Sequence, residues 1–389
     1  MAAFPDMNIL LLNYEYPPLG GGAGKATAAL MAEFETAFPD TMIDILASSA
    51  SHDAVESLSK RITLYRLDIQ KRGLLSYQSM RNLVLYLREA RKKALELMKI
   101  RSYDLVHAFF ALPTGLLPRF FLPQLPYIIS LRGSDVPGYS DRFRSLNPFL
   151  RPLFQTVCSQ AAAVTANSKG LKNLALKSAP NIDISVIPNG VSLPTIIAQP
   201  GTRRKPLRLL FVGRLIPRKG IPALLKGLAL ANQNQPLWHL DIAGSGPDQS
   251  ALQTLTHSLG INGSVAFHDQ LDKAPLDALY ADADLFILPS LNEGMSNALL
   301  EALSFGLPVA ATDTGGSAEL VNGNGRLIEK DSPQAIQQVL NDFGTHPERL
   351  ADLGKESRRI ASLFSWKNTA KGYYQLYQKT VLSSRKGNS

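Results

Sequence analysis

Two acidic side chains, Glu293 and Glu301, stand eight positions apart in residues 289–306, where a short apolar run gives way to a polar loop and then to an amphipathic stretch. This pattern predicts a buried strand, a loop that carries Glu293, and a helix that begins near Ser296 and carries Glu301 about two turns in. Ligands of open α/β sheets bind at the carboxyl ends of strands, where helix N-termini offer unpaired N–H groups to anions. One carboxylate could therefore face a sugar while the other accepts hydrogen bonds from ribose hydroxyls.

Three cations follow a second apolar run, at residues 207–212, in what we expect to be another strand-to-helix loop. They are Arg214, Arg218 and Lys219. Cationic side chains at the end of a parallel strand suit a diphosphate. Gly213, which comes directly after the run, would let the backbone approach such a ligand closely.

Short apolar runs of this kind recur along the chain between longer stretches with helical periodicity, such as residues 24–38 and 77–99. Runs that are apolar on both faces predict buried parallel strands, and their alternation with helices predicts an α/β layer structure. The first group lies at residues 8–13, 43–46, 104–109, 127–131, 161–166 and 184–187. The second lies at residues 207–212, 238–243, 265–267, 284–288 and 308–311.

The two groups of runs predict two domains. Periodicity is lost after residue 191 in a stretch rich in Pro, Gly and basic residues that ends near residues 202–206, where we place the linker. The predicted domains are residues 1–190 and 207–365. A last amphipathic helix at residues 366–385 is expected to cross back to the first domain.

Composition limits the location and the partners. One cysteine among 389 residues allows neither an intrachain disulfide nor a zinc site, and the chain shows neither a signal peptide nor a run long enough to span a membrane. We therefore expect a cytoplasmic protein. Between residues 71 and 151, fourteen Lys or Arg outnumber five Asp or Glu, in a chain whose net charge is +9. This segment is either a solvated face or a contact with an anionic membrane surface, on the inner face of the membrane.

Together these segments resemble glycosyltransferase family 4, the retaining enzymes of the GT-B fold, whose signature is a pair of glutamates separated by seven residues. The resemblance runs through almost the whole chain. The matching motifs lie at residues 16–22, 167–168, 188–190, 213–215, 219–220, 243–247, 283–285, 289–306 and 315–316.

The resemblance implies two Rossmann-like domains that face each other across a cleft, with the acceptor on the first and a nucleotide-sugar of the UDP or GDP type on the second. Carried over by position, Arg214 and Lys219 would bind the donor diphosphate, Glu301 the ribose and Glu293 the transferred sugar. Retention of anomeric configuration, no cofactor and no metal ion are also implied. The acceptor would be a glycan, a lipid-linked glycan or a small molecule, and not a nucleic acid.

Further donor-binding positions follow from the same motifs. The glycines that precede the first long helix, Gly21 and Gly22 among them, leave its N-terminus open to close approach by a diphosphate or an acceptor. The predicted donor-binding residues are Gly21, Gly22, Gly213, Gly244, His268, Gly294, Met295, Ser296 and Glu301.

One motif departs from the family pattern. Many members have His-Gly-x-Asp where this chain has Arg132, Gly133, Ser134 and Asp135. Arg132 cannot act as a general base because its guanidinium stays protonated. It could instead donate hydrogen bonds to the donor sugar or to an acceptor phosphate, with Asp135 orienting it, and both residues are kept as catalytic candidates.

Simpler interpretations and rival functions remain beside these. His107 lies in an apolar run and is expected to be a core residue, and Asp282 and Asp284 imitate an Asp-x-Asp metal motif at what we expect to be a helix-to-strand junction. An NAD-dependent oxidoreductase is one rival, although Lys25 stands where the last glycine of Gly-x-Gly-x-x-Gly would be. A nucleotide-sugar epimerase, a phosphorylase and a catalytically inactive sugar-nucleotide-binding protein are the others.

Overall fold

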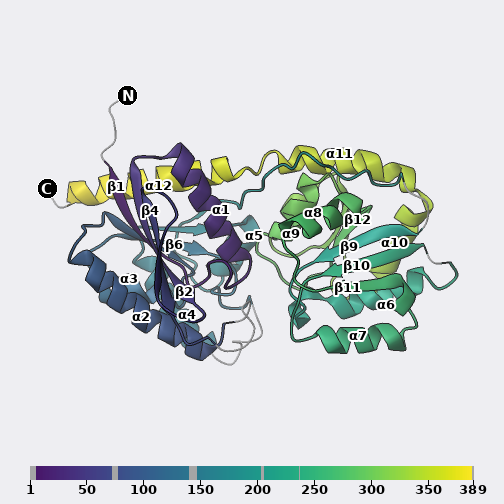
Figure 1. Cartoon of the computed structure of the whole chain (residues 1–389), viewed down its shortest axis with the longest axis horizontal. Helices are drawn as coiled ribbons and strands as arrows, with labels where there is room; N and C mark the ends of the chain where they lie inside the picture. The colour runs from purple at the N-terminus through teal and green to yellow at the C-terminus, as the bar shows by residue number, and fades with distance from the viewer. Residues whose placement is uncertain (1–5, 72–77, 140–146, 203–205, 236, 388–389) are drawn as a thin grey trace. The chain divides into compact units, whose positions relative to one another are not determined.

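The computed structural model describes residues 6–71, 78–139, 147–202, 206–235 and 237–387, and Figure 1 shows their helices and strands. The chain divides into two compact units, Met1–Gly190 with Trp366–Ser389 and Val191–Ser365. Each unit has its own sheet between helices, as expected for Rossmann-like domains. Residues 203–205 of the expected linker lie outside the described part of the chain. Within the described part, no helix is both long and apolar enough to cross a membrane.

The sheet of the first unit has eight strands in the order β3-β4-β2-β1-β5-β6-β7-β8, and every neighbouring pair is parallel except β3 with β4. Six of these strands form at the six predicted apolar runs. The other two, β3 and β4, were not predicted because their side chains alternate between more and less buried positions and form no apolar run. The strands are β1 (Met7–Leu12), β2 (Thr41–Ser49), β3 (Ala54–Ser57), β4 (Ile62–Asp68), β5 (Leu105–Phe109), β6 (Tyr127–Leu131), β7 (Ala163–Ala166) and β8 (Ile184–Val186).

Helices cover both faces of this sheet (Figure 1). On one face α1 packs against α12, and on the other lie α2, α3 and α4. A capping box starts α2: the side chain of Ser79 accepts the N–H of Asn82, and the side chain of Asn82 accepts the N–H of Ser79. The helices are α1 (Gly22–Ala37), α2 (Met80–Met98), α3 (Leu116–Phe121), α4 (Asn147–Ser159), α5 (Lys169–Leu176) and α12 (Trp366–Gly387). Residue 77, where the second helix was predicted to begin, lies outside the described residues.

The C-terminal helix α12 belongs to the first unit although the whole second unit precedes it in sequence. Its Tyr377 hydroxyl lies 2.6 Å from Nδ1 of His107 in β5, and its Tyr373 hydroxyl lies 2.9 Å from Oγ of Ser130 in β6. Ser130 Oγ is in turn 2.7 Å from Nε2 of His107. Burial, reinforced by the charge of Arg132, lowers the pKa of His107 to about 3, so the ring is neutral at pH 7. The interpretation of His107 as a core residue is confirmed.

The sheet of the second unit has six strands, all parallel, in the order β11-β10-β9-β12-β13-β14. Five form at the predicted apolar runs, and β14 was not predicted because its Arg326 and Leu327 are exposed. On one face lie α6, α7 and α10, and on the other α8, α9 and α11 (Figure 1). The strands are β9 (Leu207–Val212), β10 (Trp238–Ala243), β11 (Val265–His268), β12 (Leu285–Leu288), β13 (Val309–Thr312) and β14 (Gly325–Ile328). The helices are α6 (Ile221–Ala231), α7 (Gln249–Ser258), α8 (Lys273–Asp282), α9 (Asn297–Ser304), α10 (Pro333–Thr345) and α11 (Leu350–Ala361).

Both sheets have a point at which the strand order changes direction. It lies between β1 and β5 in the first unit and between β9 and β12 in the second. The loops that follow two such strands lead to opposite faces of the sheet, and ligands of open parallel sheets bind at the carboxyl ends beside this point. Ligand contacts are therefore expected from the loops after β1 and β5 in the first unit and after β9 and β12 in the second.

The polar network under α12 can be tested with tyrosine variants. We expect Tyr377→Phe to lower the free energy of unfolding by about 1–3 kcal/mol, because it leaves the buried Nδ1 of His107 without a partner. Tyr374→Phe is the matched control, since its hydroxyl bonds to Asp40 (2.6 Å) at a half-buried position that water can reach. Urea denaturation measures both, and equal losses would contradict a special role for the His107 network.

Candidate active site

A buried ion pair joins the two loops at the switch point of the second sheet. Lys219 ends the short 3-10 turn η2 (Pro217–Lys219) after β9, and Glu293 lies in the loop between β12 and α9. Nζ of Lys219 is 2.5 Å from Oε1 of Glu293, and the two residues are only 8% and 7% exposed. The hydroxyl of Ser290 donates to the same carboxylate oxygen at 2.7 Å. The structure thus brings two of the predicted catalytic residues into direct contact.

Arginines next to this pair set its charge state. Nη1 of Arg218 lies 3.7 Å from Oε2 of Glu293 and donates to the carbonyl of Asn292 at 2.6 Å. Burial alone would raise the pKa of Glu293, but the charges of Lys219 and Arg218 outweigh it and lower the pKa to about 2. Burial also lowers the pKa of Lys219; Glu293 offsets part of this effect, while the neighbouring Arg218 and Arg214 add to it. Two cations beside one carboxylate, with the charge of Arg214 acting on Lys219, leave net positive charge for an anionic ligand.

Glycines allow the loops around the pair to touch backbone to backbone. Gly220 has φ of 66°, and a Cβ there would lie 2.1 Å from the carbonyl oxygen of Pro289. Gly315, with φ of 49°, would place a Cβ 1.9 Å from the carbonyl oxygen of Glu293. No other residue fits either position, because real Cβ atoms do not approach oxygen so closely. Through these contacts the loop after β9 touches the backbone at Pro289, and the loop after β13 touches it at Glu293.

The segment after Glu293 leads directly into α9. Ser296 is the N-cap of α9, and its Oγ accepts a hydrogen bond from the N–H of Leu299 at 3.3 Å. Gly294, Met295 and Ser296 are all buried. The cap already uses the Ser296 hydroxyl. Contacts from these three residues to the donor substrate would therefore best be made by backbone N–H groups at the start of the helix.

Glu301 lies on α9 itself and is half-buried. It is the fifth residue of the helix, just over one turn in rather than the two turns expected. Its Oε2 accepts a hydrogen bond from the hydroxyl of Tyr280 in α8 at 2.9 Å, and burial followed by the Glu301 charge raises the pKa of Tyr280. The tyrosine orients the carboxylate and stays protonated.

The remaining donor-binding predictions in this unit lie at the carboxyl ends of the neighbouring strands β9, β10 and β11, where the N–H of Gly244 donates to the carbonyl of His268 at 3.0 Å. Gly213 and Gly244 lie together at the ends of β9 and β10, where a Cβ on Gly244 would come 2.0 Å from the carbonyl oxygen of Gly213. His268 lies on the edge strand β11, two strands from β9 and therefore roughly 10 Å away by strand spacing. Its Nε2 is 2.8 Å from Oδ1 of Asp241 in β10. The structure thus does not bring His268 to the ion pair, and its donor role stays a prediction.

Arg132 and Asp135 belong to the first unit, in the loop that follows β6. The carboxylate of Asp135 is buried and accepts N–H groups of Ala111 (2.7 Å), Arg132 (3.0 Å) and Gly133 (2.9 Å). Asp135 therefore fixes the backbone of Arg132 and not its guanidinium, which donates to Oδ1 of Asn189 (2.9 Å). Burial raises the pKa of Asp135, and the hydrogen bonds from backbone N–H groups only partly offset this effect.

The glycine loop after β1 holds a residue that the sequence did not single out. Gly21 is the N-cap of α1, and its N–H donates to Oε2 of Glu15 at 3.0 Å. Gly22 is the first residue of the helix. A carboxylate of the chain itself thus occupies one N–H of the helix N-terminus at which an anionic ligand was expected. In the sequence, an acidic residue a few positions before a glycine-rich turn was the pattern that could have predicted this role of Glu15.

The Asp-x-Asp motif is structural, as expected. Asp282 ends α8, and the buried carboxylate of Asp284 accepts the N–H groups of Gly201 and Arg208, both at 2.8 Å. Across the residues that the structure describes, no group of three or more His, Cys, Asp and Glu side chains is arranged to hold a metal ion.

Two family models match consecutive parts of the chain. The one described as Glycosyltransferase Family 4 matches residues 22–194, and the one described as Glycosyl transferases group 1 matches residues 194–360. The chain is also 31% identical over 313 residues to TuaC of Bacillus subtilis (strain 168), a glycosyltransferase assigned to teichuronic acid biosynthesis, with 75% of each chain covered. The chain belongs to glycosyltransferase family 4.

Solved structures agree with this family at the level of the fold. The sucrose-phosphate synthase of Thermosynechococcus elongatus superimposes with a TM-score of 0.83 at 21% identity, covering 97% of this chain and 100% of the other. Anabaena HepE in complex with UDP-glucose superimposes with a TM-score of 0.72 at 22% identity, covering 97% of this chain and 100% of the other. The predicted GT-B fold, with two Rossmann-like domains, is confirmed.

In this glycosyltransferase the predicted site residues form two groups, one in each unit. The second unit holds the Lys219–Glu293 pair with Arg218 beside it, and the first unit holds the loops of Gly21 and Arg132. Ser290, Tyr280 and Glu15 are further members that the sequence did not single out.

The ion pair can be tested by a double-variant cycle. We expect Lys219→Met to lower the free energy of unfolding by roughly 3–5 kcal/mol, because it leaves the buried carboxylate of Glu293 with a weaker partner. The double variant Lys219→Met with Glu293→Gln should lose less, since neither charge is then buried. Urea denaturation at pH 7 without nucleotide measures both, and a double variant less stable than the single one would contradict the pairing.

The same carboxylate predicts a dependence on pH. The folded chain lowers the pKa of Glu293 from its ordinary 4.5 to about 2, so the contribution of Glu293 to stability is complete above about pH 4.5 and is lost as the pH falls towards 2. As the pH falls through that interval, we expect the free energy of unfolding of Glu293→Gln to decrease less than that of the wild-type protein. A urea denaturation series from pH 5 to pH 2.5 measures the difference, and parallel curves would show that Glu293 is not held ionised.

Proposed function

We propose that this glycosyltransferase transfers a sugar, with retention of anomeric configuration, from a UDP- or GDP-type nucleotide-sugar bound by its second unit. No metal ion takes part in the proposed reaction. The bond between the anomeric carbon and the diphosphate breaks, a bond to an acceptor hydroxyl oxygen forms, and a nucleoside diphosphate and a proton are released. HepE, which was crystallised with UDP-glucose, supports a donor of this type.

The buried Lys219–Glu293 pair is the observation that carries the proposal. Its side chains come from the two loops beside the switch point of the second sheet, where ligands of such sheets bind. Lys219, Arg218 and Arg214 supply positive charge at this point, and negative charge grows on the diphosphate as the sugar leaves. Because Lys219 is buried and held by Glu293, it stabilises that charge without first having to reorganise.

Glu293 has a second task in this proposal. Its carboxylate is ionised at neutral pH and retains acceptor capacity beyond the bonds to Lys219 and Ser290. We assign it to the hydroxyl groups of the transferred sugar. Glu301, whose carboxylate Tyr280 orients, is assigned to the ribose hydroxyls at the start of α9. Because Glu293 and Glu301 lie eight residues apart, the same loop and helix can bind both the transferred sugar and the ribose of the donor.

The first unit is assigned to the acceptor, a glycan or a lipid-linked glycan of polysaccharide biosynthesis. TuaC, assigned to teichuronic acid biosynthesis, supports this class. The guanidinium of Arg132 suits an acceptor phosphate, since its backbone is held by Asp135 and one of its terminal nitrogens by Asn189. Cytoplasmic location and contact with an anionic membrane surface stay predictions.

Thermal denaturation against a panel of UDP, GDP, ADP, NAD and the corresponding nucleotide-sugars, with and without magnesium, tests the proposal. One nucleoside diphosphate at a hundred times its dissociation constant should stabilise the protein by about 2.7 kcal/mol without metal. We expect Lys219→Ala and Glu301→Ala to abolish that shift, because each removes a donor-binding group.

Lys226→Ala and Glu329→Ala are the matched controls, because both side chains are exposed in the same unit and both should keep the full shift. Stabilisation by NAD alone would favour an oxidoreductase. Stabilisation only with magnesium would refute metal independence. Once the donor is known, proton NMR of the product gives the anomeric configuration, and an inverted product would refute retention.

A further inference from the structure

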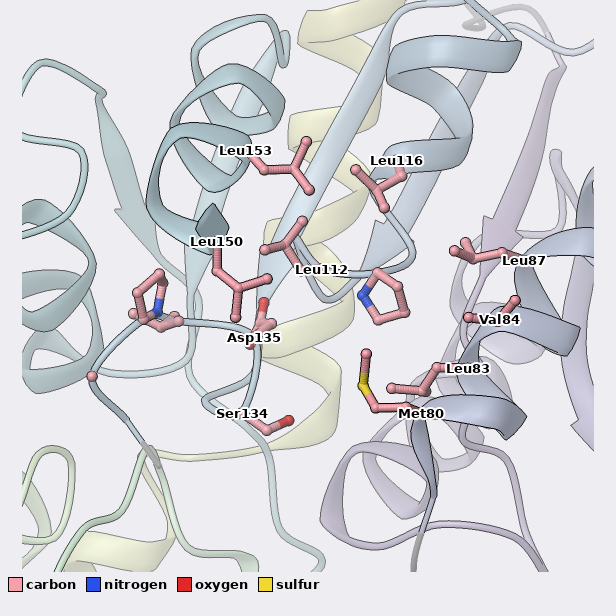
Figure 2. Close-up of a pocket in the computed structure, with 14 residues that line it drawn as sticks. Met80, Leu83, Val84, Leu87, Leu112, Leu116, Ser134, Asp135, Leu150 and Leu153 are labelled. Atoms are coloured by element: carbon pink, nitrogen blue, oxygen red, sulfur yellow. The ribbon is translucent and has the colours of Figure 1, made fainter. Parts of the chain in front are cut away.

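The first unit contains an apolar cavity that is lined by only one of the predicted site residues, Asp135. It has a volume of about 270 Å³ and is lined by α2, by the segment around Leu112, by the loop that carries Asp135 and by α4. Figure 2 shows the α2 side chains Leu83, Val84 and Leu87 on one side and Leu150 and Leu153 of α4 on the other. The cavity is slightly smaller than the ~300–1,000 Å³ typical of small-molecule sites. Apolar walls of this kind favour hydrocarbon over sugar or water.

The rim of this cavity is itself apolar and exposed. Val84, which lines it, is 61% exposed, and Met80 on the preceding turn is 50% exposed. Phe149, next to the lining residue Leu150 on α4, is 76% exposed. Large apolar side chains left in solvent beside an apolar cavity are typical of a surface that binds an apolar partner.

Cations border the apolar stripe of α2. Residues three, four and seven apart share one face of a helix, so Met80, Leu83, Val84 and Leu87 form a stripe that Arg88 and Arg91 continue towards the C-terminus. The guanidinium of Arg91 lies 4.5 Å from the ring centre of Phe121 in α3. The whole of α2 carries five Arg or Lys and two Glu. The partner should therefore carry negative charge next to its apolar part.

We infer that this cavity binds the hydrocarbon chain of an amphiphile with an anionic head group, the lipid part of the acceptor. The chain lies between α2 and α4, and the head group stays at the rim beside Arg88. This inference rests on the proposed function, because it assigns the acceptor to the first unit, where the loop of Arg132 continues directly into the cavity wall at Ser134 and Asp135. Asp135 is buried at this wall, and its burial raises the pKa of its carboxyl group.

Alkyl phosphates are suitable probes, used with the full chain and below their micelle-forming concentrations. Isothermal titration with hexyl, octyl and decyl phosphate should show affinity that rises about threefold to fourfold for each added methylene, because each one is transferred from water into an apolar site. Affinity that does not depend on chain length, or no binding at all, would overturn the inference. So would self-association of the protein in size-exclusion chromatography that decyl phosphate does not reverse, because a second copy would then cover the cavity.

Paired variants of α2 locate the binding. We expect Val84→Asp to weaken the binding of decyl phosphate at least tenfold, since the substitution places a carboxylate at the rim of the cavity. Leu95→Asp is the matched control, because it lies on the same side of α2 three turns further on, is also exposed and does not line the cavity. The affinity of the Leu95→Asp variant for decyl phosphate should change less than twofold. Equal losses in both variants would mean general adsorption to α2 and would overturn the inference.

A third variant tests the head group. Arg88→Gln should weaken the binding of decyl phosphate several-fold and leave the binding of the neutral decyl maltoside unchanged. Equal effects on both ligands would contradict a preference for an anionic head group. Nucleotide binding, measured on the same variants, separates this inference from the proposed function. Loss of decyl phosphate binding with intact nucleotide binding in Val84→Asp supports the cavity site. A wild-type protein that binds nucleotides and no alkyl phosphate overturns the cavity and leaves the proposed function standing.

Discussion

The two loops of the candidate site in the second unit are organised around a buried charge, the carboxylate of Glu293. A carboxylate that is 7% exposed is stable only if cations and donors surround it, and here Lys219, Arg218 and Ser290 do so. Those partners come from the loop after β9 and from the end of β12, so the two strands must be neighbours. The sheet order places them side by side at the switch point. The glycines that let the loops touch satisfy the same requirement.

The first unit meets a comparable requirement with neutral groups. His107 is buried and uncharged in β5, and both of its ring nitrogens have partners, one of them the Tyr377 hydroxyl of α12. The C-terminal helix is therefore part of the first core, and removing it would leave the buried Nδ1 of His107 in β5 without a partner. Asp135 plays a similar part in the loop after β6, where three N–H groups converge on its carboxylate.

The glycosyltransferase site and the lipid cavity differ in how charge is used. At the Lys219–Glu293 pair charges are buried, and their interaction is strong because water is excluded. Around the cavity, Arg88 and the other cations of α2 remain on the surface, where they attract an anion over a longer range and are screened by salt. The interior of the cavity supplies the affinity and the surface charges supply the preference for an anionic head group.

The sequence by itself determined most of the strands, the two units and the types of the site residues, because burial on both faces and glycine in loops are local patterns. It did not predict β3, β4 or β14, whose strands form no apolar run. Only the tertiary structure decided that Lys219 meets Glu293, that Glu15 takes the N–H of Gly21, that His268 lies away from the pair, and that α2 and α4 enclose a cavity. These contacts depend on which side chains meet after the strands have been ordered, and most join residues far apart in the chain, which no local pattern encodes.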